Sequence, residues 1–257
     1  MKFQAKNREL DLSSPKIMGV LNVTPDSFSD GGKFLSPEYA VIRGLEMAEE
    51  GASLIDVGGE STRPGATPVS VEEELKRVIP VIERLCAKTD CLISIDTQKP
   101  LVAFAALQAG AHIINDVFGL SNEKMMQCAV QEKAGVILMH MQGTPQTMQA
   151  EPAYGDVVAE VKAFLQSQAK AASRAGISGV MVDPGIGFGK TTEHNLALLR
   201  HLDQFQFGYP VCLGVSRKSF IGNITKDNAQ NRLEGTLSAV TAGVLAGAQV
   251  FRVHDVK

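Results

Sequence analysis

The sequence has 257 residues, of which 44% are hydrophobic and 21% are charged, and its formal net charge is −3. These values are typical of a soluble globular chain and disfavour a general nucleic-acid binder, which usually carries a basic excess. No stretch approaches the roughly 18 apolar residues that a membrane span needs, so we expect a cytoplasmic protein that binds neither membrane nor nucleic acid.

Taken in chain order, short apolar runs rich in β-branched residues predict eight strands. The runs are KIMGVLNV, SLIDVGG, CLISIDT, HIINDVFG, GVILMH, GVMVDPG, PVCLGVS and QVFRVHD. The segments between them have helical periodicity and predict seven helices. These helices are expected at about 37–50, 71–88, 99–109, 122–133, 155–175, 193–202 and 231–247.

Several of the predicted helices end at a glycine suited to a left-handed cap, followed within about three residues by the next strand. These glycines are Gly51, Gly110, Gly135 and Gly176. Strict alternation of strand and helix implies a parallel sheet, and about 250 residues is the usual size of a (β/α)₈ barrel. We therefore predict one α/β TIM barrel domain over residues 1–257, with a doubly wound open sheet as the alternative. Because the sequence stops at Lys257, just after the eighth strand, this barrel is predicted to lack its final helix.

Two familiar kinds of site do not fit the sequence. The stretch DPGIGFGK at 183–190 has Pro184 where a Walker A loop needs its first glycine, and Lys190 where the dinucleotide fingerprint needs its last. The cysteines lack the spacing of a zinc site and suggest no disulfide framework, so we expect reduced thiols. They are Cys86, Cys91, Cys128 and Cys212.

Polar side chains gather at one end of the predicted strands. They include Asn22, Asp56, Glu60, Thr62, Arg63, Asp96, Asn115, Asp116, His140, Asp183, Ser216, Arg217, Lys218, Arg252 and His254. In a barrel these strand ends converge on one mouth, where such enzymes place their chemistry. Two long irregular stretches, 24–36 and 60–70, follow strands on the same face, and loops of this length are usually functional or mobile.

Some of these residues have a structural interpretation beside the functional one. Asp56, Asp116 and His140 are the kind of buried polar group that neighbouring loops satisfy by hydrogen bonds. Asp96 is harder to explain in that way, because a carboxylate inside an apolar barrel needs a ligand or a cation beside it. Arg63 is either a solvent-facing loop charge or a side chain that closes over an oxyanion.

Six polar residues of the mouth form two groups, one of acids and an amide and one of cations. The first is Asp96, Asn115 and Asp183, and the second is Lys218, Arg252 and His254. The first group suits the N–H edge of a guanidine-like heterocycle, whereas the second suits a phosphate or diphosphate. A pterin that carries a diphosphate fits both groups, and so does a purine nucleotide.

At this point the sequence closely resembles the dihydropteroate synthases of the bacterial type, the folate-pathway enzymes that sulfonamides inhibit. Matching motifs span nearly the whole chain in family order. They are GVLNVTPDSFSDGG at 19–32, IDVGGESTRPGA at 55–66, SIDT at 94–97, IINDV at 113–117, LMHMQGTP at 138–145, DPGIGFGK at 183–190, GVSRKSFIG at 214–222 and RVHDV at 252–256.

The resemblance implies a transferase of folate biosynthesis with small-molecule substrates. It would join 6-hydroxymethyl-7,8-dihydropterin diphosphate to para-aminobenzoate, giving 7,8-dihydropteroate and diphosphate, with Mg²⁺ as cofactor. Sulfonamides would inhibit it. The family is homodimeric through helices near the carboxyl end, so the missing final helix puts dimerisation and stability in question.

The resemblance also implies a role for each motif residue. Asp96, Asn115, Asp183, Met139, Phe188 and Lys218 would bind the pterin. Asn22, Thr62, Arg63, Arg252 and His254 would bind the diphosphate, with Asn22 also on the metal. Pro64, Gly187, Phe188 and Ser219 would border the aminobenzoate. Asp96, Arg63 and Lys218 would be the catalytic residues, and the glycines of DPGIGFGK would let the backbone pass close to the flat ligands.

The implied chemistry begins with loss of diphosphate, because the electron-rich pterin delocalises the cation that remains before the arylamine attacks. The stretches 24–36 and 60–70 would close over the complex and exclude water. Two other functions stay open: a pterin-binding methyltransferase, which has no diphosphate to hold, and a non-catalytic pterin-binding module.

Overall fold

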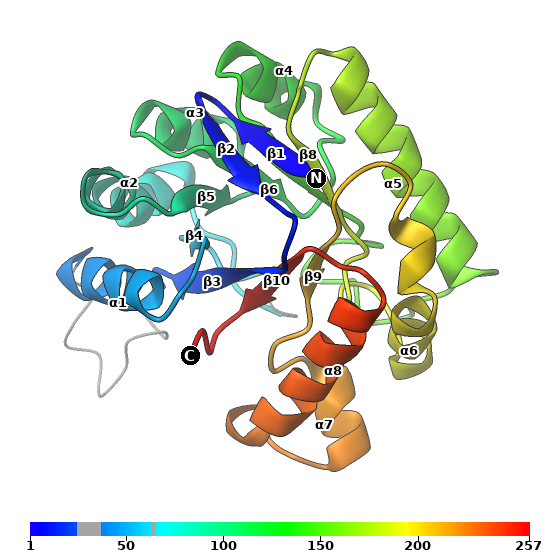
Figure 1. Cartoon of the computed structure of the whole chain (residues 1–257). Coiled ribbons are helices and arrows are strands. Elements are labelled where there is room, and N and C mark those ends of the chain that lie inside the picture. The colour runs from blue at the N-terminus through cyan, green and yellow to red at the C-terminus, as the bar shows by residue number, and fades with distance from the viewer. Residues whose placement is uncertain (25–36, 63–64) are drawn as a thin grey trace.

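The computed structural model describes residues 1–24, 37–62 and 65–257, and its centre is a sheet of eight parallel strands (Figure 1). Their order in the sheet is β8-β7-β6-β5-β4-β3-β10-β9. The strands are β3 (Lys16–Asn22), β4 (Leu54–Gly58), β5 (Leu92–Asp96), β6 (Ile113–Asp116), β7 (Gly135–Met139), β8 (Val180–Asp183), β9 (Cys212–Gly214) and β10 (Val250–Val253). Each of the eight predicted runs therefore contains a strand.

The sheet curls until its two end strands meet. Val182 of β8 forms a parallel bridge with Val211, which lies just before β9. The Val182 amide also donates a hydrogen bond to the Pro210 carbonyl at 2.9 Å. These contacts close the barrel and confirm the predicted (β/α)₈ architecture over the open doubly wound sheet.

The helices surround the barrel, and each of the seven predicted from the sequence is present (Figure 1). They are α1 (Pro37–Glu49), α2 (Val71–Lys88), α3 (Pro100–Gln108), α4 (Glu123–Gln131), α5 (Val157–Arg174), α6 (Thr192–Arg200) and α8 (Leu233–Leu245). Side chains of Ser70, Asn122, Asp156 and Thr191 cap the amino ends of α2, α4, α5 and α6. A further short helix, α7 (Ser219–Thr225), was not predicted. In the described part of the chain no helix follows β10, and none is long and apolar enough to cross a membrane.

Three of the four predicted glycine caps are confirmed and one is wrong. Gly51, Gly110 and Gly176 have φ angles of 106°, 114° and 98°, in the left-handed region. Gly135 instead begins β7, and Lys133 takes the left-handed position with φ of 52°. Gly135 is needed for space, because a Cβ there would lie 2.7 Å from the Phe3 ring.

That ring belongs to an amino-terminal hairpin that the sequence did not predict. Strands β1 (Lys2–Ala5) and β2 (Arg8–Asp11) pair antiparallel across the amino end of the barrel (Figure 1). Phe3 and Ala5 pack on a buried layer to which each barrel strand contributes one side chain. The layer is Met18, Leu54, Leu92, Ile113, Ile137, Met181, Cys212 and Val250. The hairpin therefore closes the end of the barrel opposite the polar mouth.

Candidate active site

The predicted site residues of the strands converge at the carboxyl ends, as the sequence indicates. Asn22 ends β3, Asp96 ends β5 and Asp183 ends β8. In the sheet, Asp96 pairs in register with Asn115 on one side and with Gly58 on the other. The buried Met139 pairs with Asp183 in the same way. Because all strands run parallel, these side chains share one mouth.

Arg252 lies between two buried carboxylates of this mouth. Its Nε donates to Asp56 Oδ2 at 2.6 Å, and its Nη2 donates to Asp96 Oδ2 at 2.7 Å. Asn115 Nδ2 also donates to Asp56 Oδ2, at 2.9 Å. The two groups predicted from the sequence are therefore interleaved, since a cation of the second group bonds an acid of the first.

The two carboxylates share one guanidinium, and this leaves acceptor capacity in the site. Among the described residues, Asp96 Oδ1 and Asp56 Oδ1 are buried oxygens without a hydrogen-bond partner. Burial raises the pKa of Asp96 to about 7, against the opposing effect of Arg252. A buried acceptor without a donor is unfavourable, so the site is suited to a ligand that brings N–H groups.

A second acid and cation, the buried Asp183 and the half-buried Lys218, both lie beside Gly214, where an added Cβ would be 3.7 Å from Asp183 Oδ2 and 3.5 Å from Lys218 Nζ. Asp183 Oδ1 accepts from the Gly185 amide at 2.7 Å, and its pKa is raised by burial and lowered by the charge of Lys218. Lys218 donates to the Ile186 carbonyl, and its Nζ lies 4.7 Å from the centre of the Phe188 ring. Burial lowers the pKa of Lys218 to about 8. The Lys218 ammonium therefore lies over the Phe188 ring.

The other predicted residues are placed less centrally. His254 contacts Ser216, with Nδ1 3.0 Å from the hydroxyl oxygen. Ser219 begins α7 and is exposed, while Thr62 is half-buried after β4. Arg217 turns away to pair with Asp255 at 2.5 Å. The predictions for Arg63, Pro64 and the stretch 25–36 lie outside the described residues.

The sequence analysis offers a structural interpretation for three buried polar residues, and two of them, Asp116 and His140, make the expected structural contacts. Asp116 accepts from the amides of Phe118 and Leu120 at 3.0 and 2.9 Å, which fixes the turn after β6. The ring of His140 contacts Lys190, with Nδ1 3.0 Å from Nζ. Asp56, the third, bonds Arg252 and so belongs to the charge arrangement of the mouth.

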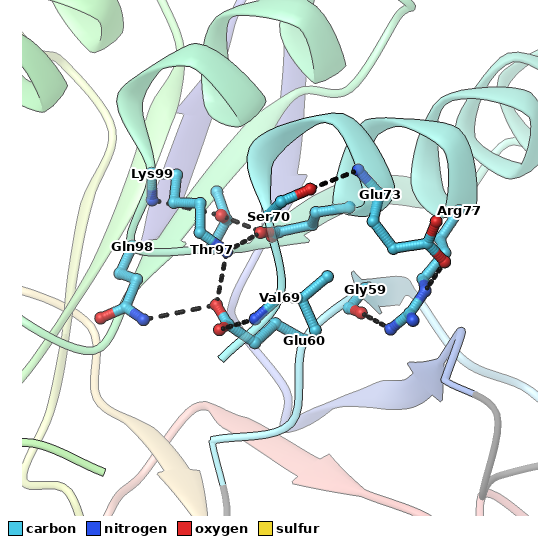
Figure 2. A network of polar contacts seen from close by, with 10 residues as sticks. Gly59, Glu60, Val69, Ser70, Glu73, Arg77, Thr97, Gln98 and Lys99 are labelled. Atoms are coloured by element: carbon cyan, nitrogen blue, oxygen red, sulfur yellow. Dashed lines mark hydrogen bonds and ion pairs between the residues drawn. The ribbon is translucent and has the colours of Figure 1, made fainter. Parts of the chain in front are cut away.

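The sequence did not single out a charged network beside Asp96, which ties the segment after β4 to the turn after β5 (Figure 2). Lys99 Nζ contacts Glu60 at 2.8 Å and Glu74 at 2.5 Å. Thr97, the residue after Asp96, donates its hydroxyl to Glu74 at 2.7 Å. Glu60 also accepts from the Val69 amide at 2.9 Å, so it joins the two ends of the segment that contains Thr62.

The glycine-rich turn after β8 also differs in part from its prediction. A Cβ on Gly185 would lie 1.9 Å from the His140 carbonyl oxygen, and one on Gly189 would lie 2.4 Å from that of Gln142. These two glycines therefore permit packing against the chain after β7. Gly187 differs, since a Cβ there would lie 3.2 Å from Lys218.

Comparisons with known proteins agree with this geometry. The sequence model of the family described as pterin binding enzyme matches residues 18–254. Dihydropteroate synthase of Escherichia coli (strain K12) is 48% identical over 260 residues, covering 100% of this chain and 92% of that protein. The crystal structure of Yersinia pestis dihydropteroate synthase in complex with a sulfonamide drug has a TM-score of 0.94 at 44% identity, covering 100% and 94% of the two chains. The Xanthomonas albilineans enzyme in complex with 7,8-dihydropteroate has a TM-score of 0.90 at 45% identity, with the same coverage.

Proposed function

The chain belongs to the dihydropteroate synthase family of pterin binding enzymes, and we propose that the mouth of its barrel joins the dihydropterin methyl group to para-aminobenzoate. The substrates are 6-hydroxymethyl-7,8-dihydropterin diphosphate and the arylamine, and the products are 7,8-dihydropteroate and diphosphate. The observation that carries this proposal is the buried Asp96 oxygen without a partner, in a mouth that also holds Lys218 and Arg252.

The acidic and amide side chains of the mouth bind the pterin in this proposal. Asp96, Asn115 and Asp183 supply acceptors for its N–H edge, and Lys218 lies against the same ring. Met139 and Phe188 line the pocket with apolar surface. The neutral ring brings donors that Asp96 lacks among the described residues, which is why this ligand fits better than a purely anionic one.

The cationic residues bind the leaving diphosphate. Arg252 and His254 belong to this part of the site, together with Thr62 and Arg63 after β4. A guanidinium has five N–H donors, and Arg252 uses two of them on Asp56 and Asp96, so it can contact both the acids and a phosphate oxygen.

The reaction then proceeds in two steps, departure of the diphosphate and attack by the arylamine. The C–O bond to diphosphate breaks and its electron pair leaves with the diphosphate. The arylamine nitrogen forms a bond to the same carbon and releases a proton to solvent. Lys218 and Arg252 stabilise the charge on the leaving group, while Asp96 offsets the positive charge that develops on the pterin. The amine is already neutral near pH 7, so the reaction needs no general base on the protein to activate it.

We propose that Mg²⁺ binds beside Asn22. A Cβ on Gly58 would lie 3.8 Å from both Asn22 Oδ1 and Asp96 Oδ2, so the glycine leaves space next to two oxygens. Within residues 1–24, 37–62 and 65–257, no three His, Cys, Asp or Glu side chains group as a metal site. Oxygen ligands from Asn22, the diphosphate and water would therefore hold the ion. When bound, Mg²⁺ neutralises charge on the leaving diphosphate.

The aminobenzoate lies beside Gly187, Phe188 and Ser219, with Pro64 from the segment after β4. We place sulfonamides at this same position, in keeping with the drug complex of the Yersinia pestis relative. The enzyme is proposed to be cytoplasmic, which agrees with its four free thiols.

We further propose a homodimer formed through α7 and α8. Large apolar side chains on these helices are exposed to solvent. They are Ile224 at 54%, Leu233 at 41%, Leu237 at 56%, Val244 at 40% and Leu245 at 84%. Positions 233, 237 and 244 recur at helical spacing on one side of α8, as expected of a face that a second copy covers.

Measuring diphosphate release with and without para-aminobenzoate tests the proposed function. Release that depends on the arylamine, together with formation of dihydropteroate, is the expected result. A methyltransferase would ignore the arylamine, and a binding module would release no diphosphate. Either of those two outcomes contradicts the proposal.

A further inference from the structure

Lys190 is a buried lysine to which the mechanism above gives no role. Its exposure is 2%, although lysine is rarely buried to this extent unless its charge is compensated. It follows the glycine-rich turn and precedes Thr191, the amino-terminal cap of α6. The surroundings of its ammonium group show what it does.

The Lys190 ammonium contacts three acceptors from two different segments. Nζ lies 3.0 Å from His140 Nδ1 and donates to the His140 carbonyl at 3.2 Å. It also donates to the Phe188 carbonyl at 2.9 Å. Three acceptors match the three N–H bonds of the ammonium form, which burial makes less stable by lowering the pKa of Lys190 to about 7. Lys190 thereby joins the end of β7 to the turn after β8.

His140 is suited to accept this bond. Burial, and then the charge of Lys190, lower the pKa of the His140 ring to about 3. The ring is therefore neutral, and with Lys190 donating to Nδ1 its proton lies on Nε2. It packs edge-on against Phe164, with ring centres 5.1 Å apart. A fixed, neutral ring gives Lys190 a rigid anchor.

The turn that Lys190 holds has few bonds of its own. Residues 185–189 include one backbone bond within the turn, from the Phe188 amide to the Gly185 carbonyl at 3.1 Å. Side chains from elsewhere bond the rest. Gln149 donates to the Gly187 carbonyl at 2.7 Å, and Tyr154 donates to the Gly189 carbonyl at 2.8 Å. Glycine-rich backbone is costly to order, so such external bonds decide its conformation.

We propose that Lys190 is a positioning residue, which holds the turn so that Gly187 and Phe188 form one wall of the aminobenzoate position. This inference rests on the proposed function, because it assigns the support for one of its two substrates. Lys190 acts through the Phe188 carbonyl. The pterin position takes Phe188 from this turn and Lys218 bonds to it, but Asp96 and Asn115 lie on strands β5 and β6, whereas the aminobenzoate position takes both Gly187 and Phe188 from the turn. Loss of the Lys190 side chain should therefore weaken binding of aminobenzoate more than binding of the pterin.

Steady-state kinetics of Lys190→Met test the inference. Losing a buried hydrogen-bond network is expected to raise KM for aminobenzoate by about tenfold or more. We expect kcat at saturating aminobenzoate, and the dissociation constant of the pterin measured by calorimetry, to stay within about threefold of wild type. Lys170→Met, on the exposed side of α5, is the matched control and should change none of these values.

A second variant keeps the test informative if Lys190→Met does not fold. His140→Phe preserves a ring against Phe164 but removes the Nδ1 acceptor, so it should raise KM for aminobenzoate in the same direction. Unchanged KM in both variants would overturn the inference. So would equal changes for both substrates with lower kcat, since this indicates general loss of structure. The proposed function itself fails only if wild-type enzyme forms no dihydropteroate.

Discussion

Arg252 and Asp96 are 156 positions apart in the sequence, and their side chains meet at 2.7 Å in the mouth of the barrel. The guanidinium also bonds Asp56, so a single cation compensates two buried carboxylates. This leaves a carboxylate oxygen of Asp96 without a donor among the described residues. The pair therefore combines the charge balance that folding requires with the acceptor that a pterin needs.

Replacing Asp96 by Asn tests this relationship directly. The amide keeps the shape but removes the negative charge that offsets the developing cation. We expect kcat/KM for the pterin diphosphate to fall by about 10²–10³-fold, as for loss of one preorganised electrostatic contact. Asp203→Asn, an exposed carboxylate near α6, is the control and should behave as wild type. Activity of Asp96→Asn within threefold of wild type would contradict the role given to Asp96.

The pH dependence of catalysis should report the ionisation of Lys218. Burial lowers the pKa of this lysine to about 8, so the ammonium is present below pH 8 and lost above it. We expect kcat/KM for the pterin diphosphate to fall about tenfold per pH unit above that value. Lys218→Arg, whose guanidinium stays charged, should lose this alkaline decline even if its activity is lower. An identical decline in both enzymes would show that another group titrates.

Much of the fold is predictable from the sequence because the barrel repeats one signal. Each buried parallel strand is a short apolar run and each covering helix has a clear period, so all eight strands and seven of the helices follow. The hairpin β1–β2 was missed because it offers few apolar residues. Its turn also has Lys6 at φ of 54°, a position where glycine or asparagine is the usual signal. Helix α7 is too short to show a period.

The site was predictable to the extent that it lies on strand ends. The network of Lys99 and Glu74 was not, because Glu74 stands in a run of three acidic residues that resembles a solvated helix face. Its side chain is in fact fully buried. The sequence likewise does not indicate a role for Lys190, because its acceptors come from the backbone and from His140, fifty positions away. Contacts between loops are a property of the folded barrel.

The network beside Asp96 should be important for stability. Lys99 bonds two carboxylates, one of them fully buried. Lys99→Met leaves both uncompensated, and we expect the free energy of unfolding in urea to fall by about 3–5 kcal/mol. Adding Glu74→Gln should restore part of this loss, because it removes one of the two unpaired charges. Arg84→Met, which breaks an exposed pair with Glu38, should lower the free energy of unfolding by at most about 1 kcal/mol. Equal effects of Lys99→Met and Arg84→Met would contradict the assignment.

The hairpin at the amino end should support stability without affecting chemistry. Phe3 is 1% exposed, and it packs on the layer to which every barrel strand contributes. Phe3→Ala leaves a cavity there, and we expect a loss of about 3–5 kcal/mol in the free energy of unfolding. At a temperature where the variant is folded, its kcat/KM should equal that of wild type, since the mouth lies at the other end. A selective rise in KM for either substrate would show that the two ends of the barrel are coupled.

The proposed dimer makes α8 sensitive to charge. In a twofold interface, Leu237→Glu places a carboxylate in the contact from each subunit. We expect the dimer dissociation constant, measured by sedimentation equilibrium, to rise at least about tenfold, which corresponds to about 1.4 kcal/mol. Leu101→Glu is the matched control, because Leu101 is 67% exposed and lies on α3, outside the proposed interface. A wild-type protein that stays monomeric at high concentration, or a Leu237→Glu variant that sediments as wild type does, would show that the apolar side of α8 is not the contact between subunits.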